Sequence, residues 1–296
     1  MTSWLLRLYP ADFRHEFGAE MTEAYREATE GAGPYTRLRE AADIAAHASR
    51  LRLRLGSAHR GGRLFAATAP FALAATAAYA SFNVVGTLAD WYGSQNPDFM
   101  VPLSYLTTGC YLLALMGAVA ALCGRFASGA RCALLGMAGA TTAFLGVMLS
   151  GPRPLPAIAW PYLLVPVAIA ALPLACPPDL RPPPRVRTAT GTVALMLWVP
   201  LCAGILALLD PGAPGLLLPW RFGTPLLTLA LVHRSAWSGI RTPGRLVLAA
   251  LSFLGMGLCA GTVDQDTLLP LTATLAVAAV ALRLRRRGDS GTASSA

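Results

Sequence analysis

The sequence predicts an all-α membrane protein: a polytopic bundle of about eight transmembrane helices, with both termini in the cytoplasm and a small helical head in front. Two observations favour this fold class. Hydrophobic residues make up 55% of the chain and charged residues only 13%, which is too little polar surface for a soluble protein of 296 residues. The apolar residues also gather in long runs, and the arginines gather between those runs.

The first span follows an arginine-rich stretch. Residues 50–63 carry five arginines, and residues 64–89 then run for 26 positions without a charge. As a helix this run would be roughly 39 Å long, which is more than the ~30 Å hydrocarbon core of a bilayer requires. A basic flank before an uncharged run places the N-terminal side in the cytoplasm.

The residues in front of that span, 1–63, predict a small cytoplasmic head of amphipathic helices. Pro10 suits the start of a helix, and apolar residues then recur every four positions to form one stripe. A second helix is expected over 35–55, after a Gly- and Pro-rich stop at 31–34. So few helices make a thin core, so the head should pack on itself and on the membrane surface or a partner. The candidate docking stripe consists of Phe13, Phe17, Met21 and Tyr25.

The second helix of the head should turn its small apolar side toward the first helix. That side consists of Leu38, Ala42, Ala45 and Ala48. A short leading helix is expected over residues 4–8, because four of these five residues are apolar.

Residues 4–29 also carry an unusual motif. It reads Trp4-Leu5-Leu6-Arg7-Leu8-Tyr9-Pro10, then Phe13-Arg14, then Phe17-Gly18-Ala19-Glu20-Met21. The motif resembles the permease prefix, a segment in front of the membrane region of some bacterial ABC-type efflux permeases and of many actinobacterial integral membrane proteins. The resemblance covers under about a tenth of the chain and implies a head, not a chemistry. The rest departs from the efflux permeases, because no large extracytoplasmic domain separates the predicted spans.

Seven further apolar runs follow the first span, which makes eight. The sixth and the eighth are near the short limit for crossing a bilayer, so a count of seven stays open. The seven further runs are residues 103–123, 132–150, 156–175, 190–209, 216–233, 246–263 and 267–284, which give a transmembrane region of 64–284.

The charges in the loops alternate as an eight-span topology requires. With both termini inside, only Arg153 and Arg221 of the 24 arginines fall on the outer side. Because positive charge stays in the cytoplasm, a wrong span count would scramble this pattern. We therefore expect a multi-pass protein of the cell (plasma) membrane. The acids expected outside are Asp90, Asp98, Asp210, Asp264 and Asp266.

No enzyme signature occurs in the chain. It has no HExxH, GxSxG, Walker A or GxGxxG motif, so we expect neither enzyme activity nor a cofactor, and an ATPase would be a separate chain. The six cysteines form no C-x-x-C pair and the four histidines are scattered, which argues against a metal site. The arginines lie in short loops between apolar runs, which excludes nucleic acid as a partner.

Charged residues inside spans usually mark a transport path, and the candidate here is Arg221, near the outer start of the sixth span. It either pairs with Asp210 or holds an anionic ligand, or it simply extends to the outer interface. Residues 285–296 are expected to form a disordered basic and polar tail. At its start lies a basic cluster that should bind anionic lipid head groups. The cluster consists of Arg283, Arg285, Arg286 and Arg287.

Pairs of small residues four positions apart permit close contact between helices. They serve packing within the bundle or between subunits of a homo-oligomer. The pairs are Ala74 with Ala78, Gly136 with Ala140, and Gly257 with Gly261.

Two functions are consistent with this organisation. In the first, the chain is an export or permease-type transport component, or an accessory, whose head docks a separate ATP-binding subunit. In the second, it is a membrane-anchored regulatory or interaction protein whose head is the working part. An intramembrane enzyme is disfavoured because no paired polar groups converge in the spans.

Overall fold

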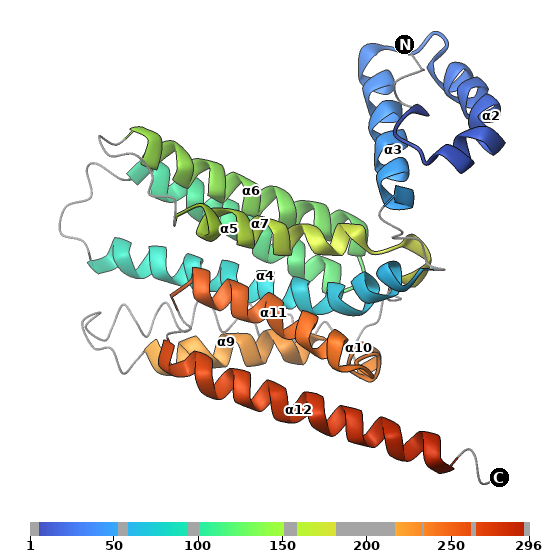
Figure 1. Cartoon of the computed structure of the whole chain (residues 1–296). Helices are drawn as coiled ribbons and strands as arrows, with labels where there is room; N and C mark the ends of the chain where they lie inside the picture. The colour runs from blue at the N-terminus through green and yellow to red at the C-terminus, as the bar shows by residue number, and fades with distance from the viewer. Residues whose placement is uncertain are drawn as a thin grey trace. The chain divides into compact units, whose positions relative to one another are not determined.

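The computed structural model describes residues 6–52, 59–93, 101–150, 159–181, 217–232, 234–261 and 265–292. Every regular element in these ranges is helical and none of them contains a strand, so the all-α class is confirmed. Figure 1 shows the chain, which divides into two compact units. The first unit is Met1–Phe65 with Ala175–Leu180, and the second is Ala66–Leu174 with Arg181–Ala296.

The longest helices of the first unit, among its described residues, are α2 (Ala11–Thr29) and α3 (Pro34–Arg52). Pro10 is the residue before α2 and has a φ of −57°, which already suits a helix. Two residues after α2, Gly31 takes a φ of +71°, which only glycine adopts without steric cost. Pro34 then opens α3, where its missing N–H is not needed.

The centre of this unit is Tyr9, whose side chain is 1% exposed. Its ring stacks on Phe13 with 5.1 Å between ring centroids. Its hydroxyl lies 3.0 Å from Nδ1 of His47 on α3, within hydrogen-bond distance. A guanidinium N–H of Arg52 also donates to the carbonyl of Arg7, at 2.7 Å. The segment before α2 is thereby tied to the second half of α3.

The side of α3 that turns inward matches the expected one only in the second half of the helix. Ala48 is fully buried and Ala45 is half-buried, but Leu38 is 70% exposed and Ala42 is also exposed. Tyr9 contacts this second half of α3, at His47. The expected spacing of 38, 42, 45 and 48 describes a helix face, but it does not decide at which end of the helix that face is covered.

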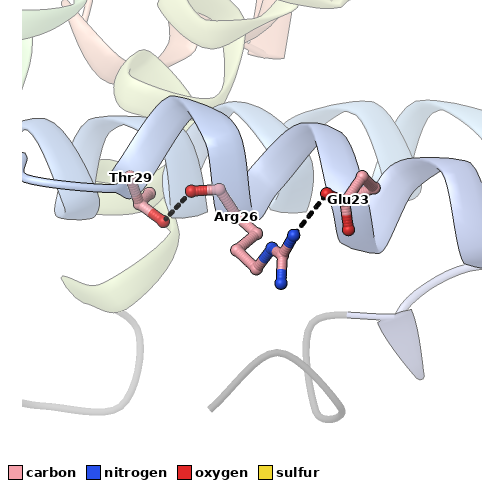
Figure 2. Close-up of polar contacts among 3 residues, drawn as sticks. All are labelled: Glu23, Arg26 and Thr29. Atoms are coloured by element: carbon pink, nitrogen blue, oxygen red, sulfur yellow. Dashed lines mark hydrogen bonds and ion pairs between the residues drawn. The ribbon is translucent and has the colours of Figure 1, made fainter.

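The outer surface of α2 is held only by local contacts (Figure 2). Arg26 donates to Glu23 at 2.6 Å, with the two side chains 71% and 55% exposed. The Thr29 hydroxyl donates to the carbonyl of Tyr25 at 2.7 Å and lies 3.4 Å from that of Arg26. An exposed ion pair of this kind contributes little stability, so the head depends on the ring cluster around Tyr9.

The second unit holds the helices that correspond to the expected spans. The fifth expected span, residues 190–209, lies outside the described residues. Proline lies inside several of these helices, at positions that include Pro70, Pro166 and Pro225. The helices are α4 (Arg60–Gly93, of which the first turns belong to the first unit), α5 (Val101–Leu122), α6 (Phe126–Ser150), α7 (Ala159–Ala171), α9 (Leu217–Leu231), α10 (Arg234–Ser238), α11 (Pro243–Cys259) and α12 (Gln265–Thr292).

By length and composition, two helices in the described part of the chain can cross a membrane: Arg60–Leu88 and Tyr105–Leu122. Three shorter apolar helices accompany them, over Tyr162–Ala175, Pro243–Cys259 and Leu268–Leu284. The first of the long helices is 67% buried over its most apolar window and the second 33%. Of the two long helices, α4 is therefore the more central one in the unit.

Helices α5 and α6 form an antiparallel pair joined by a tight turn. Gly124 takes a φ of +110°, and the N–H of Arg125 donates back to the carbonyl of Ala120 at 3.0 Å. This is the Schellman arrangement that ends a helix at a glycine. The pair is so close that a Cβ atom on Gly136 would lie 2.5 Å from the carbonyl oxygen of Cys110. The small-residue pair at 136 and 140 therefore serves packing within the chain.

Two apolar clusters attach α4 to its neighbours. In one, Phe71 and Ala74 pack with Val232 and Ala249. In the other, Ala72 and Ala75 pack with Ile169 of α7 and Met256 of α11. Phe71 packs with Ala249, whereas Tyr79, eight residues later on α4, packs against the cluster that contains Met256. The two helices therefore run in the same direction, as Figure 1 shows. Elsewhere α6 packs on α5 and α7, and α11 packs on α7 and α12.

Two expectations for the C-terminal region are wrong. Helix α12 does not end near Leu284 but runs to Thr292, so residues 285–292 are helical where a disordered tail was expected. Arginine is a good helix former and positive charge suits the end of a helix, so no signal stops α12 at its basic cluster. Gly261 lies beyond the end of α11 with a φ of +64°, so Gly257 and Gly261 do not form a stripe on one helix.

Candidate binding site

An apolar cavity of about 440 Å³, partly open to the surface, lies within the second unit. Its walls come from α4, α9, α10 and the turn after it, α11 and α12. The volume falls within the range of sites for small organic ligands. In the described part of the chain, no charged side chain lines this cavity.

Aromatic side chains hold the helices apart around this space. Phe71 of α4 meets Trp237 of α10 edge to face, with 5.0 Å between ring centroids. Trp237 is fixed by its indole N–H, which donates to the carbonyl of Val232 at 3.2 Å. Further along α4, Tyr79 lines the cavity and meets Tyr111 of α5 edge to face, with 6.1 Å between centroids. Phe253 of α11 packs against both apolar clusters.

Two of the few polar groups in the wall donate to nearby backbone carbonyls. The Thr274 hydroxyl donates to the carbonyl of Leu271 at 2.8 Å, and the indole N–H of Trp237 is bonded as described. Thr224 is 2% exposed. A ligand that carried a charge deep into this space would lose its hydration without gaining a partner. The arrangement therefore suits an uncharged, apolar ligand.

The cavity is elongated along α4 and α11. On α4 its wall extends from Phe71 to Phe82, and along α11 from Leu246 to Ala260, the residue directly after the helix. At the helical rise these spans measure about 16 and 21 Å. Since the two helices run in the same direction, one end of the cavity is near Phe71 and Leu246 and the other near Phe82 and Ala260.

The two charged residues that the sequence suggested as a site, Arg221 and Asp210, are not among the described residues that line the cavity. Arg221 lies in α9, three positions before the cavity-lining Thr224. Asp210, its candidate partner, lies outside the described residues. The pairing of the two therefore stays a prediction.

The stripe on α2 is partly used inside the head. Phe13, Met21 and Tyr25 are half-buried and Phe17 is 37% exposed. Phe13 belongs to the Tyr9 ring cluster and lies 5.0 Å from Phe17 between ring centroids. The large apolar side chains that stand furthest out are on α3 instead. They are Tyr35, 79% exposed, and Leu38, 70% exposed.

The basic cluster at the end of the chain is carried on α12. Arg283 is exposed, and Arg285, Arg286 and Arg287 continue the same helix. Before the cluster, α12 leaves large apolar side chains uncovered, such as Leu269 at 75% and Val277 at 70%. An exposed apolar helix followed by arginines has the composition of a segment that meets a membrane surface.

In the described residues, no group of three or more His, Cys, Asp or Glu side chains is placed to hold a metal ion. The five cysteines described are free, and Cys176 is buried. They serve as small apolar packing residues, as free cysteine commonly does.

No protein-family model matches the chain, and no curated protein or solved structure shows significant similarity to it. The likeness to the permease prefix therefore depends on the motif of residues 4–29 alone. In the structure, Tyr9 of that motif is the buried centre of the head and Phe13 is its stacking partner.

Proposed function

We propose that this chain is a multi-spanning integral membrane protein of the cell membrane, with about eight spans and both termini in the cytoplasm. We further propose that it works as an export or permease-type component together with a separate cytoplasmic partner. The observation that carries the second proposal is the uncharged cavity between α4, α9, α11 and α12, because a bundle that moves an apolar cargo needs such a space.

The head supplies a surface for the cytoplasmic partner. Tyr35 and Leu38 of α3 expose 79% and 70% of their surfaces, next to Arg37 and Arg39. Tyrosine and arginine are both enriched at the centre of protein interfaces. An ATP-binding subunit is the partner we propose, because the chain has no nucleotide motif of its own.

The topology can be tested by thiol labelling of single cysteines in a variant whose own cysteines are replaced. With a membrane-impermeant reagent added to intact cells, Asp264→Cys should react and Ser128→Cys should not. The Ser128→Cys variant should react only after the membrane is permeabilised. Reaction at both positions in intact cells, or recovery of the protein in the soluble fraction, would remove the basis for a membrane function.

The transport role can be tested by gentle purification of the full chain. An ATP-binding chain should co-purify, and Leu38→Glu should abolish its recovery. Ala19→Glu is the matched control, because it adds the same single charge at an exposed position of α2, away from Tyr35 and Leu38. Absence of any ATP-binding chain, together with unchanged lipid or drug export in a deletion strain, would contradict this proposal.

A regulatory role is the second candidate, and the separate compactness of the head favours it. In that case the head is the working part and the bundle anchors it. Deletion of residues 1–55 should then abolish all function while the remainder still inserts. In a transport component, the same deletion should prevent partner recruitment but leave ligand binding in the cavity intact.

A further inference from the structure

We propose that the cavity holds one acyl chain of an anionic phospholipid, whose head group lies against the arginine-bearing turn between α10 and α11. This inference rests on the proposed membrane function and names the class of ligand for the same site. It is carried by the cavity's length, its apolar wall and the charge at one of its ends.

The dimensions of the cavity fit a hydrocarbon chain. The wall on α4 is about 16 Å long and that on α11 about 21 Å, whereas one leaflet of a ~30 Å hydrocarbon core is about 15 Å deep. An engineered cavity of ~150 Å³ accepts benzene, with six carbons. A space of about 440 Å³ therefore accommodates roughly 18 carbons on the same scale. Both measures match a single lipid chain.

Two arginines are sequence neighbours of residues that line one end of the cavity. Ile240 precedes Arg241, which lies in the turn, and Leu246 follows Arg245, which lies in the first turn of α11. Arg245 donates one N–H to the carbonyl of Gly239 at 2.6 Å, which holds its side chain over the turn. Each guanidinium has five N–H donors, so further donors can reach a phosphate.

Acidic groups do not offset this charge in the surrounding helices. The described segments from Leu217 to Val232 and from Arg234 to Gly261 contain no Asp or Glu. Arg241 is exposed and donates Nε–H to the carbonyl of Ser238 at 3.2 Å. An anionic head group at this turn meets only cationic and neutral neighbours on these helices, whereas a zwitterionic one would also bring its own positive charge.

The proposed topology places this end at the cytoplasmic leaflet. The turn between α10 and α11 joins the sixth and seventh expected spans on the inner side of the membrane. Arginines are enriched on that side, and the anionic lipids of the cytoplasmic leaflet attract them. The chain of the lipid would then extend between α4 and α11 toward the middle of the bilayer.

The experiment is native mass spectrometry of the delipidated full chain in detergent, titrated with three probes. They are dioleoyl phosphatidylglycerol, dioleoyl phosphatidylcholine and free oleate. One molecule of phosphatidylglycerol should bind about tenfold more tightly than phosphatidylcholine. Oleate should bind less tightly than phosphatidylglycerol, because it lacks the phosphate and the second chain. Tighter binding of oleate would assign the cavity to free fatty acids and overturn the head-group site.

Two variants locate the ligand. Ala250→Phe puts a ring into the cavity and should weaken phosphatidylglycerol binding at least tenfold; Leu251→Phe, at the next position of α11, is 52% exposed and outside the cavity, and should change nothing. Arg241→Gln should weaken phosphatidylglycerol about fivefold and leave phosphatidylcholine unchanged. Arg125→Gln, an exposed arginine in the turn between α5 and α6, is the control.

The results separate this inference from the proposed function. Equal binding by wild type and Ala250→Phe, or equal affinity for the two phospholipids, would overturn the lipid site while the thiol-labelling topology still stands. Leu251→Phe and Ala250→Phe introduce the same ring at neighbouring positions, so a difference between them reports on the cavity. If Ala250→Phe disturbs the fold, the purified protein should lose its monodispersity. In that case Arg241→Gln alone decides whether the lipid site exists.

Discussion

The α5–α6 pair and the region between α4, α11 and α12 show two opposite ways of packing apolar helices. Between α5 and α6, a Cβ atom on Gly117, Gly129 or Gly136 would come closer than 3.0 Å to backbone atoms of the opposite helix. Around the cavity, aromatic side chains such as Phe71 and Trp237 stand among smaller residues such as Ala250. Both regions are apolar, yet one is closed to atoms and the other leaves room for a ligand.

The difference teaches that the size of residues at the contact, more than their hydrophobicity, decides whether helices close on one another. Glycine lets two backbones meet, and dispersion then acts along the whole seam. Aromatic rings meet at their tips first, because edge-to-face pairs keep their centroids about 5 Å or more apart. The predictions below test this contrast.

The largest effect is expected at the glycine seam. Gly129→Ala would put a Cβ 2.5 Å from the carbonyl oxygen of Gly117, so α5 and α6 must separate. We expect the free energy of unfolding to fall by about 2–3 kcal/mol, measured by denaturant unfolding in detergent. In Gly109→Ala on α5 the added methyl meets nothing within 4 Å, so that variant should be neutral or slightly more stable. Equal behaviour of the two variants would contradict the contrast.

The opposite sign is expected at the cavity. Ala250→Leu adds three carbons to the wall of an existing space. In delipidated protein it should raise the free energy of unfolding by about 1.5 kcal/mol, by the same measurement. A loss comparable to that of Gly129→Ala would mean that no free space is present there.

The head offers a third kind of contact, in which a buried ring also carries a polar group. Tyr9→Phe keeps the ring but removes the hydroxyl that lies 3.0 Å from Nδ1 of His47. We expect a loss of about 1 kcal/mol in the local stability of the head, seen as faster trypsin cleavage at Arg37 in the full chain. Unfolding of the α5–α6 pair should be unchanged, and a change there would show that the two units unfold together.

The smallest effect is expected at the surface of α2. Glu23→Gln removes the ion pair with Arg26, whose side chain is 71% exposed. Solvent screens such a pair, so the stability of the head should change by less than ~0.5 kcal/mol. The same cleavage assay at Arg37 measures it. A larger effect than that of Tyr9→Phe would mean that the ring cluster does not dominate the head.

Local signals predicted the bounds of helices well. The Gly- and Pro-rich stop at 31–34 ends α2 and opens α3, and the apolar run at 64–89 lies within α4. These signals succeed because a positive φ or a missing N–H acts within a few residues. The end of α12 could not be found in this way. The chain is expected to leave the membrane at Leu284, but leaving the membrane does not by itself end a helix.

The cavity could not be predicted. Nothing in the linear pattern pairs Trp237 with Phe71, some 166 positions earlier. The same limit explains Leu38, which has the spacing of a core residue but lies where no partner reaches it.

What the sequence by itself determined is the helical class, the positions of most helices and the uneven distribution of arginine, because composition, periodicity and turn residues act locally. Only the tertiary structure decided that the glycines of α5 and α6 face one another, that Tyr9 is the centre of the head, and that a space remains between α4 and α11. Each of these depends on which side chains meet from distant parts of the chain, and contact between two surfaces depends on the shapes of both.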